Sequence, residues 1–285
     1  MRQALGIDVG GTKMAAGVVT DEGELMAKRQ EPTRGEDAEA LFSLLLSLVE
    51  EVRTGDEVAC GVGCGGPMSP GGELVSPLNI PAWRDFPLRR RLGEATELPT
   101  FVDNDAKAMA LGEGWVGAAR GEENFVAMVI STGVGGGIAL DGHLLHGAGG
   151  NAGHIGHVIV DPDGRRCGCG ARGCLEAADS GPSIHAITGR PPEEATAEVV
   201  QRTGMLVGRA VASVANLLDL RLAVAGGGVA LGFGTPFFTA AQAEIDRSAR
   251  LDFSSGARMV PAGLGGDGGV VGGARVVLLG LGEER

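Results

Sequence analysis

The chain has 285 residues, which is enough for one large domain or two modest lobes with a sizeable buried core. Hydrophobic residues make up 44% and charged residues 21%, a composition that is typical of globular proteins and excludes a disordered chain. The formal net charge of −12 disfavours nucleic acid or an anionic membrane as a partner, and no apolar run reaches the length of a membrane span.

Glycine, with 51 residues, is present at more than twice its usual share. The glycines follow no fixed period, which excludes collagen-like and repeat architectures. Many of them stand in short clusters after apolar runs, where backbone amides can approach a ligand closely. The N-terminal sequence MRQALGIDVGG lacks the basic and then apolar pattern of a signal leader, so we expect a cytoplasmic protein.

The first part of the chain predicts three strands, a helix and a further strand. Residues 5–20 read as two short strands joined by a glycine turn, and residues 24–29 as a third strand. Leucines and valines at helical spacing predict a helix within 36–54. A buried strand over 58–62 follows and ends in glycines. This order resembles that of the ribonuclease H-like unit.

A second pattern of strand, glycine turn and strand begins near Asn124. Two such openings predict two similar lobes with a cleft between them. The longest helical pattern covers residues 195–218 and leads into a strand that ends in three glycines. Apolar residues interrupt the glycine-dense segment 263–273, which favours a packed turn and helix start over a flexible linker. A short apolar helix over 274–281 is expected to end the pattern.

These patterns predict an α/β protein with two lobes. Residues 1–107 are expected to form a smaller N-terminal lobe, which a C-terminal helix within 274–285 joins. Residues 108–273 are expected to form the larger lobe.

Residues 8–13, DVGGTK, place an acid at a strand end, followed by two glycines, a hydroxyl and a cation. This composition suits a phosphate cradle, because glycines let amides converge on phosphate oxygens while the acid can hold a metal-bound water. An ordinary hairpin turn is the alternative interpretation, since paired glycines are common there. The candidate phosphate-binding residues of this loop are Asp8, Gly10, Gly11, Thr12 and Lys13.

The segment STGVGGG at 131–137 repeats this theme in the second half of the chain. Its Thr132 and Gly133, facing the first loop across a cleft, are expected to grip a triphosphate from the opposite side. A third glycine cluster follows an apolar strand, where the adenosine of a nucleotide could lie close to the backbone. An ordinary strand-to-helix turn explains that cluster nearly as well. The third cluster comprises Gly226, Gly227 and Gly228.

The segment FVDNDA at 101–106 ends a short strand and opens an alanine-rich helix. Phosphoryl transfer to a hydroxyl needs mostly positioning, together with one carboxylate that accepts the proton. Asp103 or Asp105 at this boundary could supply that carboxylate. A helix N-cap is the other interpretation, because Asp and Asn are preferred at that position.

His157, Cys167, Cys169 and Cys174 have the spacing H-x9-C-x-C-x4-C. Three thiolates and one imidazole make a closed tetrahedral zinc site of the structural kind, which leaves no position for a catalytic water. Buried or reactive thiols are the alternative, but they would not need such close spacing on a hydrophilic loop. We therefore expect a zinc knuckle over 157–174.

The motifs DVGGTK, ND at 104–105, STGVGGG, GHIGHVIVDPDGRRCGCGARGCLE and AVAGGGVA follow one another in the order and spacing of a known family. The chain resembles the ROK family of bacterial sugar kinases from about residue 5 to its C-terminus, and most closely the ROK glucokinases. The CGCGARGCLE knuckle is the most specific element. The resemblance implies an actin/hexokinase-like (ribonuclease H-like) two-lobed fold with an interlobe cleft. It also implies ATP-dependent phosphorylation of a hexose, most closely glucose, at the 6-hydroxyl.

The resemblance also implies roles for single residues. Asp105 matches the catalytic base that deprotonates the 6-hydroxyl of the sugar. His157 matches a residue that binds zinc through one ring nitrogen and a sugar hydroxyl through the other, which is sensible because the metal fixes the tautomer and orientation of the ring. Glu176 matches the carboxylate that binds hydroxyls near C1 and C2. The positions that match further sugar-binding residues are Gly66, Asn79 and Asn104.

Two departures from the family pattern concern the sugar. His154 stands where the family usually has Glu, and a neutral histidine cannot reproduce the two charged acceptor oxygens of a carboxylate. We still expect His154 to bind substrate, although the identity of the sugar is then open. The segment between Glu176 and the long helix is also shorter than in the family, so the lid and the subunit contacts are expected to differ.

The resemblance implies ATP, Mg²⁺ and a structural Zn²⁺ as cofactors, and a homodimer or homotetramer. N-acetylmannosamine, N-acetylglucosamine, mannose or fructose could replace glucose as substrate, and polyphosphate could replace ATP as donor. The family includes transcriptional repressors, but those carry a helix-turn-helix before the DVGG loop, and we expect none where that loop begins at residue 8. A catalytically silent sugar-binding protein is the remaining alternative.

Overall fold

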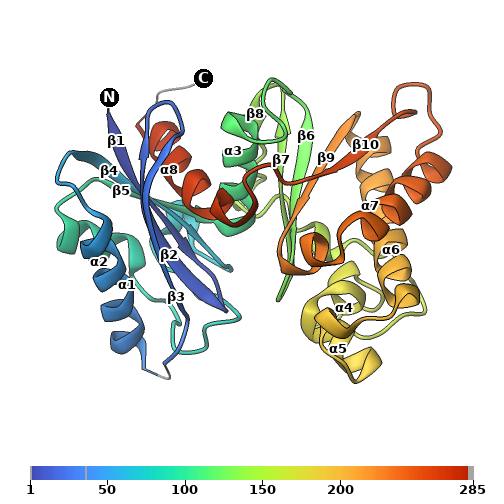
Figure 1. Cartoon of the computed structure of the whole chain (residues 1–285), viewed down its shortest axis with the longest axis horizontal. Coiled ribbons are helices and arrows are strands. Elements are labelled where there is room, and N and C mark those ends of the chain that lie inside the picture. The colour runs from blue at the N-terminus through green and yellow to red at the C-terminus, as the bar shows by residue number, and fades with distance from the viewer. Residues whose placement is uncertain (1, 36, 282–285) are drawn as a thin grey trace. The chain divides into compact units, whose positions relative to one another are not determined.

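The computed structural model describes residues 2–35 and 37–281 of the chain, and Figure 1 draws it as a ribbon. The chain forms two compact units. Unit 1 comprises Met1–Gly117, Gly147–Gly150 and Gly266–Arg285, and unit 2 comprises Ala118–His146 and Asn151–Gly265. The lobe boundaries expected at 107 and 273 stay a prediction, while the compact units of the structure change over after Gly117 and Gly265.

Unit 1 contains a five-stranded mixed sheet in the order β3-β2-β1-β4-β5. Strands β1, β2 and β3 form an antiparallel meander, whereas β4 and β5 run parallel to β1. The bounds are β1 (Gln3–Val9), β2 (Lys13–Thr20), β3 (Leu25–Pro32), β4 (Glu57–Cys64) and β5 (Thr100–Asn104). The expected order of three strands, a helix and a strand is confirmed, and the expectation of an α/β protein with it.

Four helices cover the sheet of unit 1, with α1 and α2 on one face and α3 and α8 on the other (Figure 1). Helix α1 forms within the expected segment because Asp37 caps its N-terminus and apolar residues recur at helical spacing along its buried side. The bounds are α1 (Ala38–Val52), α2 (Leu88–Thr96), α3 (Asp105–Val116) and α8 (Gly268–Gly280), with short 3-10 helices η1 (Pro70–Gly72) and η4 (Gly265–Asp267).

Helix α8 explains part of the glycine excess in this chain. A Cβ added at Gly6 of β1 would lie 2.1 Å from the carbonyl oxygen of Val270, and one at Gly61 of β4 would lie 2.0 Å from that of Gly273. The helix therefore contacts the sheet at backbone distance, which only glycine permits. The packed turn and helix start expected within 263–273 are confirmed by η4 and by the start of α8 at Gly268, so the helix expected over 274–281 begins six residues earlier. Residues 282–285 lie outside the described part.

Unit 2 contains a second five-stranded sheet, in the order β10-β9-β6-β7-β8. Strand β6 pairs antiparallel with β7 and parallel with β9, which pairs parallel with β10. The strands are β6 (Phe125–Ile130), β7 (Val134–Leu140), β8 (His143–Leu144), β9 (Leu222–Gly226) and β10 (Arg258–Pro261). The helices are α4 (Leu175–Asp179), α5 (Gly181–Thr188), α6 (Ala197–Leu218) and α7 (Gly228–Ser248), with 3-10 helices η2 (Ile155–His157) and η3 (Pro192–Glu194).

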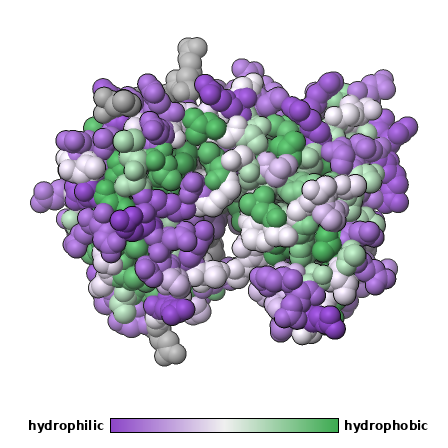
Figure 2. All heavy atoms as spheres, viewed as in Figure 1, coloured by the Kyte–Doolittle hydropathy of each residue, from purple (hydrophilic) through white to green (hydrophobic). Residues whose placement is uncertain are grey.

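Helices α6 and α7 pack closely against each other, because Gly204 and Gly208 of α6 lie directly against the carbonyl oxygens of Phe237 and Ala241. Each unit has its own apolar core, and hydrophilic side chains cover the outer edge of unit 2 on the face shown in Figure 2. Among the described helices, none combines the length and apolar character needed to cross a membrane.

Candidate functional site

The carboxyl ends of three parallel strands meet at one edge of the sheet in unit 1. Val9 at the end of β1 pairs with Cys64 at the end of β4, which in turn pairs with Asn104 at the end of β5. The segments that follow these ends are the glycine loop from Gly10, the turn at Gly65–Gly66, and the start of α3. Because ligands of α/β proteins bind outside the carboxyl ends of parallel strands, this edge is the candidate site of unit 1.

Asn104 and Asp105 occupy the junction of β5 and α3. Asn104 is the N-cap of α3, and its side-chain oxygen accepts a hydrogen bond from the amide of Ala106 at 3.1 Å. Asp105 accepts from the same amide through Oδ1 at 2.8 Å. A Cβ added at Gly65 would lie 3.9 Å from Asp105 Oδ2, and one at Gly66 would lie 3.6 Å from Asn104 Nδ2. Both side chains therefore lie beside the glycine turn that follows β4, and Asn104 provides the helix cap.

Asn79 lies beneath the DVGG loop. A Cβ added at Gly11 would lie 2.3 Å from the Cβ of Asn79, so only glycine lets the loop cross over this side chain. The neighbouring amide of Leu78 donates to the carbonyl oxygen of Gly66 at 3.1 Å. The structure thus brings Gly11, Gly66 and Asn79 together, as the candidate site requires.

The DVGG loop is itself a tight hairpin turn between β1 and β2. The amide of Gly10 donates to the carbonyl oxygen of Lys13 at 3.0 Å, and the hydroxyl of Thr33 donates to the carbonyl of Gly10 at 2.7 Å. The hairpin interpretation is therefore correct, and it does not exclude a phosphate site. Because the amide of Gly10 closes the turn, its contribution to phosphate binding would require another geometry.

Asp8 and Asp105 place two carboxyl groups at the same edge. Burial and, to a smaller extent, the charge of Asp105 raise the pKa of Asp8 to about 6, while Lys13 and Lys28 oppose this rise. Burial and the two nearby carboxylates also raise the pKa of the Cys64 thiol, which stays an inert core residue. A divalent cation prefers oxygen ligands and would relieve the repulsion between the carboxylates, so the donor set fits Mg²⁺.

In unit 2, a glycine cluster again follows the carboxyl ends of parallel strands. Val129 of β6 pairs with Gly226 at the end of β9. Gly227, with φ of 92°, is the N-cap of α7, and an added Cβ there would lie 2.4 Å from the carbonyl of Ile130. The turn that contains Thr132 and Gly133 is closed by a hydrogen bond from the amide of Ser131 to the carbonyl of Gly133 at 2.9 Å.

These contacts place the second and third glycine clusters side by side within unit 2. A Cβ added at Gly228 would lie 3.9 Å from the hydroxyl of Ser131, and the amide of Gly181 donates to the carbonyl of Ser131 at 2.7 Å. The N-terminus of α7 and the β6–β7 turn thus form one surface of backbone groups, a geometry that suits phosphate or nucleotide.

Glu176 lies against the β6–β7 turn, because α4 begins directly after Cys174. Its Oε2 accepts a hydrogen bond from the amide of Val134 at 2.9 Å, and an added Cβ at Gly133 would lie 3.1 Å from the same atom. The carboxylate is therefore held by the backbone of β7. Glu176 and Gly133 are thus neighbours in the structure, although the sequence predicts that Glu176 binds the sugar and that Gly133 binds the triphosphate.

His154 and His157 lie one turn apart around the 3-10 helix η2. Their rings are nearly parallel, at 16°, with centroids 6.2 Å apart. His154 is exposed, and its Nδ1 donates to the carbonyl of Asn151 at 2.8 Å. That donation leaves Nε2 of the neutral ring as an acceptor. Gly156 lies against the carbonyl of Val134 at a distance that admits no side chain, so η2 is held directly on β7.

The four expected metal ligands come together in unit 2. One ligand atom from each of His157, Cys167, Cys169 and Cys174 lies within 4.8 Å of all the others. Sγ of Cys167 is 3.7 Å from Nδ1 of His157, and Sγ of Cys169 is 3.7 Å from Sγ of Cys174. Ligand sulfurs of a tetrahedral zinc with bonds of about 2.3 Å lie about 3.8 Å apart, so the cluster has the dimensions of such a site.

The backbone of the knuckle is closed by its own hydrogen bonds. The amide of Cys167 donates to the carbonyl of Ala171 at 2.8 Å, and the amide of Val160 donates to that of Gly173 at 2.9 Å. Burial raises the pKa of the Cys174 thiol to about 12, whereas a backbone hydrogen bond from Ala171 lowers that of Cys169. A bound cation would hold all three thiols as thiolates, which fits zinc.

Three titratable side chains near these groups have no sequence pattern that singles them out. Lys28 bonds the turn before α8, Lys107 is a buried lysine in the first turn of α3, and Asp179 is a buried carboxyl at the end of α4. None of the three belongs to a motif, and the surrounding sequence does not indicate which residue each of them contacts in the fold. Only the folded structure could reveal them.

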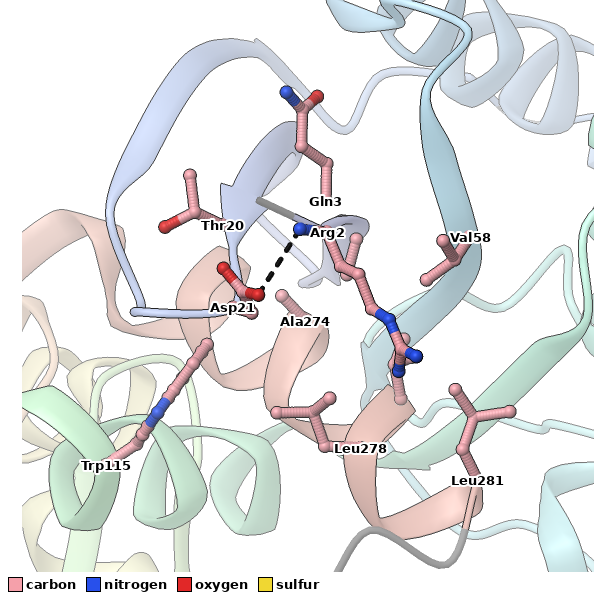
Figure 3. A pocket seen from close by; sticks show the side chains of 11 residues that line it. Arg2, Gln3, Thr20, Asp21, Val58, Trp115, Ala274, Leu278 and Leu281 are labelled. Atoms are coloured by element: carbon pink, nitrogen blue, oxygen red, sulfur yellow. Dashed lines mark hydrogen bonds between the residues drawn. The ribbon is translucent and has the colours of Figure 1, made fainter.

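A separate pocket of about 170 Å³ lies at the other end of unit 1 (Figure 3). Its walls include Trp115 of α3, Val58 of β4, and Ala274 and Leu278 of α8. It lies at the amino end of β1, whereas Asp8 lies near the carboxyl end of that strand. No candidate site residue lines it.

The comparisons with known proteins agree with one another. The model of the ROK family matches residues 4–279. The glucokinase of Halalkalibacterium halodurans is 34% identical, over 97% of this chain and 95% of that protein. The N-acetylmannosamine kinase of Escherichia coli O157:H7 is 36% identical, over 81% and 84%. A ROK family glucokinase from Streptomyces griseus, solved with glucose and AMPPNP, superimposes with a TM-score of 0.84 and 30% identity, over 95% and 98%.

Proposed function

The chain belongs to the ROK family, and from that premise we propose that it is an ATP-dependent kinase that phosphorylates glucose at the 6-hydroxyl. The resemblance seen in the sequence is thereby confirmed, as is the actin/hexokinase-like two-lobed α/β fold. The observation that carries the proposal is the edge of unit 1, where Asp105 stands beside Asp8, the DVGG turn and the glycines after β4.

Asp105 is the proposed catalytic base. Phosphoryl transfer to an alcohol requires that the hydroxyl lose its proton as the new bond forms, and a positioned carboxylate serves that purpose. The amide of Ala106 holds Oδ1 of Asp105, while Oδ2 lies toward the turn at Gly65. Asn104 lies beside Gly66 in the turn after β4, and Asn79 follows Leu78, whose amide bonds the carbonyl of Gly66, which supports their role in binding the sugar.

Phosphate- and nucleotide-binding roles are proposed for the glycine turns of each unit, taken separately. In unit 1 the DVGG loop residues, with Thr12 and Lys13, would bind phosphate, and Asp8 would hold the Mg²⁺ that accompanies it. Magnesium supplies the charge that neutralises the phosphates. In unit 2 the backbone around Thr132 and Gly133, and the helix start at Gly226, Gly227 and Gly228, provide the surface for the nucleotide.

Zinc is proposed to be structural, held by His157, Cys167, Cys169 and Cys174. With Nδ1 of His157 on the metal, Nε2–H is a donor whose orientation the metal fixes, and it can bind a sugar oxygen. The carboxylate of Glu176, two residues after Cys174, lies on α4 directly after the knuckle and is held by the amide of Val134. Zinc at this site would thus orient His157 and fix the start of α4, and it would take no part in the phosphoryl transfer.

The choice of sugar is proposed to depend on His154. In the neutral ring of His154, Nε2 can accept one hydrogen bond from a sugar hydroxyl, whereas a glutamate would offer two charged oxygens. Glucokinases and N-acetylmannosamine kinases both stand among the relatives, so this family accepts hexoses that differ at C2. We propose glucose as the substrate and N-acetylmannosamine as the first alternative.

The test is the release of ADP from ATP and Mg²⁺ with a panel of hexoses. The panel contains glucose, N-acetylmannosamine, N-acetylglucosamine, mannose and fructose, with polyphosphate as a second donor. Turnover with glucose as the preferred substrate supports the proposal, and the absence of turnover with every sugar and both donors contradicts it. Asp105→Asn is expected to lower kcat by about 10²- to 10⁴-fold while isothermal titration still detects the sugar. Near-normal turnover in this variant would remove Asp105 from the mechanism.

We propose a cytoplasmic location, since a site with three cysteine ligands suits a reducing compartment. We also propose a homodimer or homotetramer. Light scattering coupled to size exclusion measures the mass, and a 28.8 kDa particle at every concentration would contradict an oligomer.

A further inference from the structure

Lys28, on β3, donates hydrogen bonds to the turn that leads into α8. Its Nζ donates to the carbonyl oxygen of Gly266 at 2.7 Å and to Oδ1 of Asp267 at 2.7 Å. The lysine side chain is 18% exposed and that of Asp267 is 51% exposed. Some 239 residues separate the two partners in the sequence. The pair therefore joins the outermost strand of the sheet to the C-terminal part of the chain.

This turn places the start of α8 against Asp8. Helix α8 begins at Gly268, directly after Asp267, and its second residue is Gly269. A Cβ added at Gly269 would lie 2.4 Å from both Cγ and Oδ2 of Asp8. The backbone at the start of α8 is thus one wall of the space that the Asp8 carboxylate occupies. A shift of this turn would change the position of that carboxylate.

We propose that Lys28 and Asp267 are positioning residues for the phosphoryl donor: their ion pair holds the first turn of α8 against Asp8 and so fixes the direction of its carboxylate. The inference rests on the proposed function, in which Asp8 holds the magnesium that accompanies ATP. Lys28 stands on β3, at the edge of the sheet opposite β5, which ends at Asn104. Its loss is therefore expected to affect the donor and to leave the sugar largely unaffected.

The charges around Asp8 agree with this assignment. The neighbouring charged groups are Lys13 on β2, Lys28 on β3, Asp105 on α3, and Asp267 before α8. Lys28 and Lys13 are the cations that lower the pKa of Asp8, against burial and Asp105, which raise it. Removing Lys28 therefore removes a positive charge near the carboxylate as well as the bond to the turn before α8.

The experiment compares Lys28→Met, Asp267→Asn and the double variant with the intact chain. Lys28→Met is expected to raise KM for MgATP about five- to tenfold, with KM for the hexose changed less than twofold. Asp267→Asn is expected to raise KM for MgATP in the same direction, and the double variant to resemble the stronger single variant, since both remove one interaction. Lys28→Arg, which keeps the charge, should restore part of the loss.

Arg29 provides a matched control on the same strand. Its Nε lies 3.3 Å from Oε2 of Glu51, and both side chains are 58% exposed. Arg29→Met removes this surface ion pair and the bond from Arg29 to the carbonyl of Lys28, and it leaves the Lys28 side chain with Asp267. This variant is expected to keep both KM values. Thermal melting of all variants separates a folding defect from a kinetic one, and Asp267→Asn and Lys28→Arg remain informative if Lys28→Met unfolds.

Two results would overturn the inference while leaving the proposed function intact: an unchanged KM for MgATP in Lys28→Met, or equal increases in the two KM values. Absence of turnover in the intact chain would instead contradict the proposed function. In that case, titration of MgATP into the same variants still decides whether Lys28 and Asp267 support a donor site, because weaker binding than in Arg29→Met is the expected result.

Discussion

Lys107, a buried lysine in the first turn of α3, donates from Nζ to the carbonyl oxygen of Gly150. A cation near a helix N-terminus opposes the helix dipole, and here Asp103, 3.6 Å away, offsets it. Gly150 is exposed and belongs to Gly147–Gly150, the short segment that unit 1 takes from the middle of the chain. The lysine therefore adds a side-chain bond from α3 to this glycine-rich loop, beside the backbone bond from Gly150 to Gly147.

Lys107→Met is expected to release this loop. Gly150 precedes Asn151, whose carbonyl accepts the hydrogen bond from His154, so the released loop should place His154 less well. We expect KM for the hexose to rise about three- to tenfold and hydrogen exchange of the amides around residue 150 to accelerate. Arg120→Met, at an exposed position of the segment after α3, is the control. Unchanged exchange at residues 147–151 would show that the bond does not hold the loop.

Asp179 is a buried carboxyl whose ionisation opposes folding. Its side chain is fully buried at the end of α4, and neither of its oxygens has a hydrogen-bond partner among the described residues. Burial raises its pKa well above the usual range, and Arg202, 3.9 Å away, only partly counters this. Because the folded pKa exceeds the unfolded value near 3.9, the favourable contribution of the protonated form is complete below about pH 4 and is lost as the pH rises.

Asp179→Asn removes this titration. The variant is therefore expected to be more stable than the intact chain at pH 8, by about 1 to 3 kcal/mol of unfolding free energy, with the difference shrinking toward pH 4. Urea unfolding at a series of pH values measures it. Asp56→Asn, at an exposed residue, should give no such pH-dependent difference. A constant difference between Asp179→Asn and the intact chain at all pH values would contradict a buried titrating carboxyl.

The parts of the fold that sequence patterns predict are those with clean periodicity. The strands around the DVGG loop, the helix within 36–54 and the helix within 195–218 are all present. The sequence pattern does not predict helix α7, because Gly234, with φ of 60°, kinks the helix and Pro236 follows, which interrupts the helical periodicity. Helix α8 extends into the glycine-dense segment for a related reason: its glycines lower the helix propensity, but they are required for backbone contact with the sheet.

The residues of the candidate site likewise divide into those that a local sequence pattern predicts and those that it does not. Motif residues such as Asn104 and the four zinc ligands are recognisable because their types and spacing carry the chemistry. Lys28 and Lys107 are recognisable only from tertiary contacts, since a lysine on a strand or in a helix is usually a solvated side chain. Whether a lone charged residue is buried depends on segments far along the chain, which no local pattern encodes.

Removal of the zinc should weaken the binding of the sugar more than the binding of the phosphoryl donor. Cys169→Ser replaces one thiolate by a hydroxyl, which is a poor zinc ligand, and should release the metal or lower its affinity strongly. Because His157 is a ligand of the knuckle and Glu176 follows its last cysteine on α4, we expect KM for the hexose to rise at least tenfold, with a smaller change in KM for MgATP. Metal content by plasma emission, together with kinetics after treatment with a chelator, checks this.

Cys60 offers a control for the zinc experiment, because it is a fully buried thiol of β4 in unit 1. Cys60→Ala should keep one zinc per chain and an unchanged KM for the hexose. Full zinc content in Cys169→Ser together with normal kinetics would mean that this thiol is not a ligand.

His154→Glu tests whether this position reads the sugar. The histidine ring is exposed, donates from Nδ1 to Asn151 and presents a single acceptor nitrogen, whereas a glutamate presents two charged oxygens. Hydrogen bonds to a charged acceptor are about twice as strong as neutral ones, so the variant should lower KM for glucose about three- to tenfold. It should also change the ratio of kcat/KM between glucose and N-acetylmannosamine, which differ at C2.

His146→Glu adds the same charge at another exposed position of the preceding loop and is expected to leave both the KM for glucose and this ratio unchanged. Identical KM values for every sugar in His154→Glu and the intact chain would remove His154 from substrate recognition, and selectivity would then have to reside in groups such as Glu176 and Asn79.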